Sequence, residues 1–320
     1  MAATQVGWIG LGSMGIGMSK NLQKYLSSIS APPLIYTNRT LSRGESLAAL
    51  GAAPVQSVGE VAKKSDIIFS CFLQVSNDAV LQQVADDIVA SGNVSGKVYV
   101  DCSTVHPDTS IAVSKKISEA GAEFIAAPVF GASPMAEAGK LIFVTAGPPA
   151  ATAKIAPYLS GVMGRSVIDM GADVSKSSLL KIAGNICVVS FMEVISEAHV
   201  FAEKTGLGPA IMEQMLGDMF GPVIESYSKR LTTGAYAPAP DGKAGFDVQL
   251  AIKDAKHALN CAKSAGTRLE VSEVALKHME EAQSAVGERP LDSSAMYGTI
   301  RTEAGLDFFT ELCKKRDSEA

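Results

Sequence analysis

The sequence predicts an α/β fold in two parts: a doubly wound parallel sheet of the Rossmann type, followed by an all-helical domain that a long interdomain helix joins to it. Short apolar segments alternate with helical segments as far as residue 170. The alternation then stops, and one long apolar helical segment is followed by helical patterns alone. We therefore expect domains at residues 1–170 and 171–320.

The first element is a strand at 4–10, which runs into a glycine-rich turn and a segment with helical spacing at 13–26. A strand, a tight glycine turn and a helix N-terminus direct backbone N–H groups and the positive end of a helix dipole toward a pyrophosphate. The alternative is a structural strand-to-helix turn. The context favours a dinucleotide site formed by Gly10, Leu11, Gly12, Ser13, Met14 and Gly15.

The remaining elements are expected from the same patterns of apolar residues. Further strands are expected at 33–38, 65–73, 97–103, 123–129, 140–147 and 165–170, and further helices at 46–52, 78–92, 107–122 and 149–161. Strands that alternate with helices through short turns are typical of a mostly parallel sheet. The second domain begins with a helix at 174–206 and stays helical, apart from the loop 232–246, where Pro and Gly break any periodicity.

The end of the second strand predicts which nicotinamide cofactor is used. NAD sites usually carry an acidic residue there, whereas this strand ends in Asn38, Arg39 and Thr40. Arginine matches a 2′-phosphate by charge and by its forked donors, and Arg43 is close enough to help. The alternative is an ordinary exposed arginine after a strand. We expect NADPH to be preferred over NADH.

The long helix carries two polar residues in apolar surroundings. Nearly every position from Leu179 to Ile195 is apolar or small, which predicts burial on most sides. Lys181 and Asn185 interrupt this stretch at i and i+4, and so share one face. A lysine there is a natural general acid beside a carbonyl substrate. The alternative is a snorkelling lysine or one half of an ion pair.

Two further polar segments follow sheet strands at the edge where ligands bind in open α/β sheets. Ser103 and Thr104 lie in the segment 101–107 and offer hydroxyls to an anion. The alternative is an ordinary N-cap before Pro107. The segment 127–133 has the same position and supplies backbone donors.

Together these motifs resemble the β-hydroxyacid dehydrogenase family, the group of 3-hydroxyisobutyrate dehydrogenase, tartronate semialdehyde reductase, glyoxylate/succinic semialdehyde reductase and, more distantly, 6-phosphogluconate dehydrogenase. Residues 10–22 look like its cofactor motif, and 101–107 look like its D-x-S-x-x-x-P substrate motif. Residues 171–185 end in its K-x-x-x-N pair, and 246–259 are similar to its late F…KD motif. The motifs occur in the family's order over most of the chain.

The resemblance assigns roles to named residues. Lys181 would be the proton donor and acceptor, and Asn185 would orient the substrate. Ser103 and the backbone at Gly131 and Ala132 would hold a substrate carboxylate. The cofactor would be lined by Phe72, Leu73, Asn77 and Thr104, with Lys253 reaching toward it from the helical domain.

One position departs from the family. Relatives often have Ser-Gly-Gly after the A-P-V sequence, whereas this chain has Phe130, Gly131 and Ala132. A phenyl group replaces a hydroxyl at the substrate site, which removes a hydrogen-bond donor and adds bulk.

The resemblance implies an NADPH-dependent reductase of a small aldehyde or keto acid, running reversibly as a hydroxyacid dehydrogenase. An imine reductase on the same fold is one alternative, although those enzymes generally carry another residue at the position of Lys181. A non-catalytic NADPH-binding regulatory module is the other alternative, but such a module would not need a lysine in an apolar helix.

Composition argues against several other classes of protein. A net charge of −5 argues against a nucleic-acid binder. Five scattered cysteines without a CxxC pair suit free thiols in a reducing compartment, and four histidines, none clustered with another or with cysteine, predict no metal site. We expect no membrane span, because no apolar run reaches the needed length.

The sequence also leads to expectations about cellular location and oligomeric state. The N-terminus resembles neither a secretory signal nor a transit peptide, so a cytoplasmic protein is expected, or a mitochondrial one if a presequence was removed. A homodimer or homotetramer is expected, because the long apolar helix offers more surface than one subunit can cover.

Overall fold

A computed structural model describes residues 4–72 and 77–319. The chain divides into two compact units, residues 1–181 and 182–320, and the division falls inside the long helix α8 (Val174–Thr205). Up to Lys181 this helix belongs to the first unit: Val174 packs into a core of that unit, and the Ser177 hydroxyl donates to the carbonyl of Val144.

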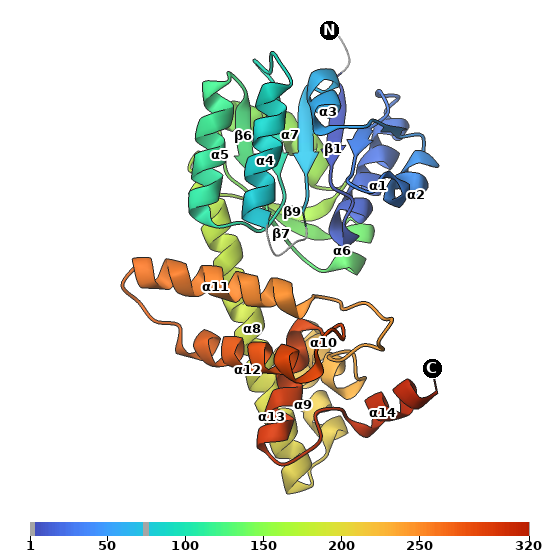
Figure 1. The fold of residues 1–320 in the computed structure, drawn as a ribbon, viewed down its shortest axis with the longest axis vertical. Helices are drawn as coiled ribbons and strands as arrows, with labels where there is room; N and C mark the ends of the chain where they lie inside the picture. Colours follow the sequence, from blue (N-terminus) through green and yellow to red (C-terminus); the bar gives the residue numbers. More distant parts are fainter. Residues whose placement is uncertain (1–3, 73–76, 320) are drawn as a thin grey trace. The chain divides into compact units, whose positions relative to one another are not determined.

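The first unit is built on a six-stranded sheet in the order β3-β2-β1-β4-β5-β6, and every neighbouring pair is parallel (Figure 1). Its strands are β1 (Val6–Ile9), β2 (Ile35–Thr37), β3 (Ala53–Pro54), β4 (Ile67–Ser70), β5 (Val98–Asp101) and β6 (Glu123–Ala126). The order reverses direction between β1 and β4, which is the switch point of the Rossmann fold. The predicted fold class is confirmed.

Helices cover both faces of this sheet, since its central strands are buried on both sides. They are α1 (Ser13–Ser28), α2 (Glu45–Ala48), α3 (Val58–Lys64), α4 (Asn77–Ala90), α5 (Pro107–Glu119), α6 (Ser133–Glu137) and α7 (Pro149–Leu159), with a 3-10 turn at Leu41–Gly44. Trp8 packs with α1 and α7 on one face, and the neighbouring Ile9 packs with α3, α4 and α5 on the other. This alternation explains why all four residues of β1 are buried.

Two of the expected strands belong to a separate small sheet. Strand β7 (Val129–Phe130) runs antiparallel to β8 (Leu141–Thr145), and β8 runs parallel to β9 (Gly164–Asp169). The expected strands at 140–147 and 165–170 therefore exist but do not extend the large sheet. Pairing with β7 fixes the backbone of Phe130 opposite Ile142.

The second unit is helical in the part of the chain that the structure describes. After α8 come α9 (Pro209–Phe220), α10 (Pro222–Thr232), α11 (Val248–Ser264), α12 (Glu270–Val286), a 3-10 turn at Ser293–Ala295, α13 (Met296–Glu303) and α14 (Glu311–Ser318). Val189 of α8, Ala251 of α11 and Met279 of α12 meet in its core, and Tyr236 is fully buried there. None of the five cysteines, all of which the structure describes, forms a disulfide.

Helix α8 differs from the sequence analysis in its apolar length and in its burial. By length and composition it could cross a membrane, with a mean hydropathy of 1.7 over its most apolar window, of which 39% is buried. A core helix of a soluble protein meets the same criterion, and Val189, Met192 and Ile195 are indeed core residues. The stretch from Leu179 to Ile195 is also not buried on most sides, since Leu179, Phe191 and Val194 are 43%, 48% and 55% exposed.

Candidate active site

The glycine turn after β1 requires glycine at two positions. Gly10 has φ +96°, and a Cβ atom there would lie 2.6 Å from the carbonyl oxygen of Cys71. A Cβ on Gly15 would lie 2.3 Å from the carbonyl oxygen of Gly10. Gly12 is the N-cap of α1 and provides no side-chain cap, so the first N–H groups of the helix remain for an external acceptor. The turn therefore fits the pyrophosphate of a dinucleotide.

Two of the predicted turn residues can face a cofactor only through their backbone. The side chains of Leu11 and Met14 are buried in the core beneath the turn, whereas Ser13 is exposed. Side-chain burial here holds the turn against the sheet, and the main chain is left to contact the ligand.

Asn38 supports this turn from the end of β2. Its Oδ1 accepts a hydrogen bond of 2.9 Å from the N–H of Leu11, and its Nδ2 donates to the carbonyl of Thr40 at 2.8 Å. Arg39, Thr40 and Arg43 are exposed. Among the described residues, neither arginine forms an ion pair, so both guanidinium groups can meet an anionic ligand.

A buried polar network joins the carboxyl ends of β4 and β5. The Asp101 carboxylate accepts from the hydroxyl of Ser70 at 2.7 Å and from the hydroxyl of Ser103 at 2.8 Å. The Ser103 oxygen in turn accepts from the N–H of Phe72 at 2.9 Å. Burial raises the pKa of Asp101 to about 6, although the hydrogen bonds from both serines oppose the rise.

This network changes the interpretation of Ser103. Its side chain is 3% exposed, and its single hydroxyl proton is directed to Asp101. Ser103 therefore holds the segment after β4 in place. Its contact with a substrate carboxylate, which the resemblance implies, stays a prediction. Asp101 was absent from the predicted site; its signal in the sequence is a carboxylate that directly follows Val98, Tyr99 and Val100, all of them buried.

The cofactor-lining prediction concerns the segment after β4. The Asn77 amide donates to the carbonyls of Phe72 at 3.1 Å and Thr104 at 3.4 Å, so it ties this segment to the one after β5. The ring of Phe72 lies against Gly10, 3.2 Å from where a Cβ would be. Phe72 thus connects the glycine turn to Asn77 and, through Asn77, to Thr104. The fourth predicted residue, Leu73, lies outside the described residues.

The predicted proton donor lies over an aromatic ring. The Nζ of Lys181 is 4.6 Å from the centre of the Phe130 ring, and both side chains are half-buried. Gly131, with φ +125°, turns the chain after Phe130, and a Cβ there would be 2.8 Å from Leu141. Ala132 is the N-cap of α6. The first unit thus brings Lys181 to the segment 130–132.

The second unit holds the other predicted residues in one buried group. The Asn185 amide donates to Asp254 Oδ2 at 2.6 Å, and the Lys253 ammonium lies 2.9 Å from Asp254 Oδ1. All three side chains are at most 8% exposed. Asp254 was not among the predicted site residues, although it follows Lys253 directly in the late motif. Asn185 stands one turn after Lys181 on α8.

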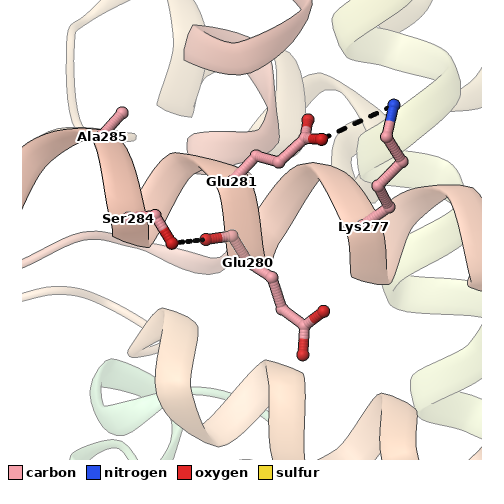
Figure 2. Close-up of a pocket in the computed structure, with 5 residues that line it drawn as sticks. All are labelled: Lys277, Glu280, Glu281, Ser284 and Ala285. Atoms are coloured by element: carbon pink, nitrogen blue, oxygen red, sulfur yellow. Dashed lines mark hydrogen bonds and ion pairs between the residues drawn. The ribbon is translucent and has the colours of Figure 1, made fainter.

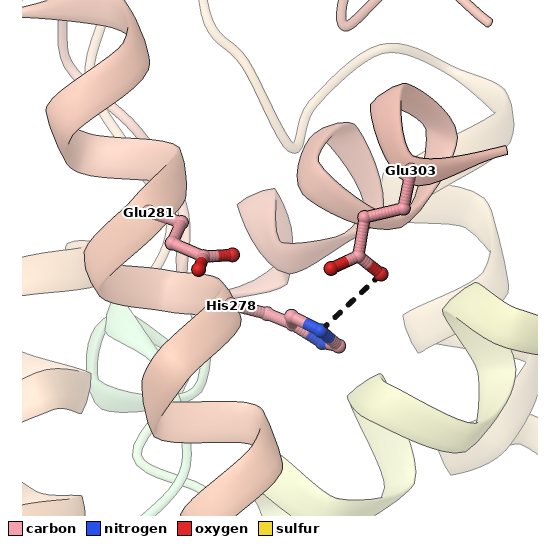
Figure 3. Close-up of side chains that lie close together, drawn as sticks. All are labelled: His278, Glu281 and Glu303. Atoms are coloured by element: carbon pink, nitrogen blue, oxygen red, sulfur yellow. Dashed lines mark ion pairs between the residues drawn. The ribbon is translucent and has the colours of Figure 1, made fainter. Parts of the chain in front are cut away.

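A different ionisable cluster lies on α12. His278 Nδ1 is 2.6 Å from Glu193 of α8. On the other side of the ring, His278 Nε2 is 3.6 Å from Glu303 of α13, as Figure 3 shows. Burial raises the pKa of Glu193, and repulsion from Glu197 and Glu303 adds to this, while His278 opposes it. The cluster joins three helices of the second unit.

The same cluster could hold a metal ion by geometry, because ligand atoms of His278, Glu281 and Glu303 lie within 4.8 Å of one another. The spacing of histidine and cysteine along the chain does not indicate this group, because two of its three members are glutamates. However, the Lys277 ammonium lies 3.6 Å from Glu281 and 3.5 Å from Glu303, so part of the charge of the two carboxylates is already neutralised. The candidate dehydrogenase chemistry makes no use of this group.

A hollow beside the same helix is lined by Lys277, Glu280, Glu281, Ser284 and Ala285 (Figure 2). All five belong to α12, and none is a predicted site residue. Its charged lining is accounted for by ordinary surface contacts, such as that of Lys277 with Glu281 and of the Ser284 hydroxyl with the Glu280 carbonyl.

Comparison with known proteins agrees with this division of the chain. Residues 5–171 match the family profile described as the NAD binding domain of 6-phosphogluconate dehydrogenase. Residues 176–300 match the profile described as NAD-binding of NADP-dependent 3-hydroxyisobutyrate dehydrogenase. Together the two profiles cover both units, and the first alone covers more than half of the chain.

Individual relatives extend over nearly the whole chain. NADH-dependent oxidoreductase ucdB of Aspergillus ustus is 31% identical over 93% of this chain and 99% of its own length. Glyoxylate/succinic semialdehyde reductase 2, chloroplastic, of Arabidopsis thaliana is 32% identical over 82% of this chain and 70% of its own. The crystal structure of 3-hydroxyisobutyrate dehydrogenase (ygbJ) from Salmonella typhimurium has the same fold, with a TM-score of 0.79 and 21% identity over 92% of this chain and 99% of that one. The chain belongs to the β-hydroxyacid dehydrogenase family of NAD(P)-dependent oxidoreductases.

Proposed function

We propose that this protein reduces a small aldehyde or ketone, keto acids included, to the corresponding alcohol with NADPH, and that Lys181 donates the proton. The observation that carries the proposal is the half-buried ammonium of Lys181, held over Phe130 in the K-x-x-x-N sequence of a dehydrogenase family. A half-buried lysine beside a binding segment has the reach and the proton that a general acid needs.

When bound, the nicotinamide supplies the hydride that reaches the carbonyl carbon. The Lys181 ammonium gives a proton to the carbonyl oxygen, and the same group takes it back in the reverse direction. Asn185 orients the substrate, and Asp254 holds its amide in place. The glycine turn after β1 and the Asp101 network hold the cofactor-binding segments in position.

The preference for NADPH rests on the end of β2. Arg39 and Arg43 are exposed there, no carboxylate follows the strand, and two forked cations match a 2′-phosphate. One relative is named an NADH-dependent oxidoreductase, so both cofactors belong in the test.

The test is oxidation of NADPH and of NADH by the purified protein with a panel of aldehydes, 2-keto acids and one cyclic imine. Turnover of an aldehyde or keto acid, faster with NADPH, supports the proposal. Turnover of the imine alone would indicate an imine reductase. Tight cofactor binding with no turnover of any compound would indicate a regulatory module.

We also propose that a second copy of the chain covers the apolar surface of the second unit. Phe201 is 62% exposed, and Ile211 and Met219 on α9 are 61% and 71% exposed. Apolar surface on this scale is typical of an interface between subunits. Sedimentation of a monomer at micromolar concentration would contradict this.

A further inference from the structure

The side chain at position 130, beside Lys181, is an apolar ring where relatives often have a hydroxyl donor. The Phe130 ring is half-buried and presents a face to the Lys181 ammonium at 4.6 Å. Strand pairing with β8 holds the Phe130 backbone, and Gly131 adopts the positive φ that the turn after it requires. The backbone that carries the ring is therefore held in place beside Lys181.

The predicted substrate-binding hydroxyl, that of Ser103, is already engaged in other hydrogen bonds. Ser103 is buried, donates its only proton to Asp101 and accepts from the N–H of Phe72. To donate to a substrate carboxylate it would have to leave the buried Asp101 without that hydrogen bond, which is unfavourable. A carboxylate placed against Phe130 would likewise lose water without gaining a side-chain partner from the ring.

We infer that Phe130 determines specificity: the substrate is a carbonyl compound that presents an alkyl or aryl group to this ring instead of a second, anionic group. The inference rests on the proposed function, because it concerns the carbonyl that Lys181 protonates. The ring would contribute apolar contact to the substrate and hold the ammonium over its face.

The test compares two aldehydes of similar length, pentanal and succinic semialdehyde, which share the OHC-CH2-CH2 group and end in an ethyl group or a carboxylate, respectively. We expect the parent to favour pentanal in kcat/KM by about tenfold or more, and Phe130→Ser to lower that ratio by about tenfold. Phe130→Leu keeps the apolar wall and should retain the ratio. NADPH binding by each variant checks that it is folded.

Binding of unreactive analogues separates this inference from the proposed function. Calorimetry in the presence of NADPH would compare pentanamide with succinamate on the parent and on Phe130→Ser. Tighter binding of pentanamide, lost in the serine variant, supports the inference even if no aldehyde is turned over. Preference of the parent for succinic semialdehyde or succinamate, or ratios that Phe130→Ser leaves unchanged, would overturn it.

Discussion

Asp254 holds Asn185 and Lys253 at once: one carboxylate oxygen accepts from the Asn185 amide at 2.6 Å, and the other lies 2.9 Å from the Lys253 ammonium. All three side chains are buried. The orientation of Asn185 and Lys253 therefore depends on Asp254, which was not among the predicted site residues.

Asp254→Asn should destabilise the second unit by about 3–5 kcal/mol, because the buried Lys253 loses its ion-pair partner. The measurement is the free energy of unfolding in denaturant. Glu280→Gln is the matched control, since it removes the exposed ion pair with Lys256 and should change stability by less than about 1 kcal/mol.

Replacing both Lys253 and Asp254 by apolar residues tests whether an unpaired buried charge causes the loss of stability in Asp254→Asn. The double variant Lys253→Met, Asp254→Leu should regain much of the stability that Asp254→Asn loses, because no buried charge remains unpaired. If the double variant is as unstable as the single one, the charge left on Lys253 is not the cause of the instability of Asp254→Asn.

Lys181→Ala should lower turnover by at least about 10²-fold, the lower bound of what a general acid contributes. NADPH affinity should change little, because the glycine turn and Arg39 are untouched. Lys176→Ala, at an exposed lysine earlier on α8, is the control and should keep its turnover. A Lys181→Ala variant that folds, binds NADPH and turns over within a few-fold of the parent would remove this lysine from the mechanism.

Arg39→Asp should weaken NADPH binding by about tenfold or more, since loss of a charge-assisted contact costs about 1.5–3 kcal/mol. NADH binding should be unchanged or tighter, because the new carboxylate can accept from the ribose hydroxyls. Dissociation constants for both cofactors decide this, with Arg165→Asp as an exposed control in the same unit. An unchanged NADPH constant would assign the selectivity to Asn38, Thr40 or Arg43.

The pKa of Asp101, raised to about 6 by burial, predicts a pH effect. Between the ordinary value of 3.8 and this value, the folded state binds more protons at Asp101 than the unfolded state does. The parent should therefore gain unfolding free energy relative to Asp101→Asn as the pH falls from about 7 to about 4. A stability difference between the two proteins that is constant over this range would contradict the raised pKa.

Phe201→Glu combined with Met219→Glu should shift the protein toward monomers, because each substitution puts a charge on an exposed apolar side chain of the second unit. Sedimentation velocity is the measurement. Leu312→Glu, at an exposed leucine of α14, should leave the sedimentation coefficient unchanged. A double variant that assembles like the parent would place the interface elsewhere.

Several features could be predicted from the sequence because they depend on local pattern. The buried strand β1, the glycines that allow its tight turn, and the helical spacing of α1 are all encoded in neighbouring residues. The same holds for the polar ends of β2 and β5, because a strand directs the residues after it to one edge of the sheet. Fold class and the positions of most site residues follow from such patterns.

Contacts between distant residues were decided by the tertiary structure. Asn185 and Asp254 are 69 positions apart, and nothing near either one indicates that packing of α8 against α11 brings them together. Ser103 had the signature of a ligand donor, yet its proton goes to Asp101, because only packing of β5 beside β4 shows what is buried at that edge. The apolar stretch of α8 likewise predicted burial, but hydrophobicity states only that a side chain favours leaving water. Which neighbour covers it depends on the arrangement of whole helices, which no local pattern contains.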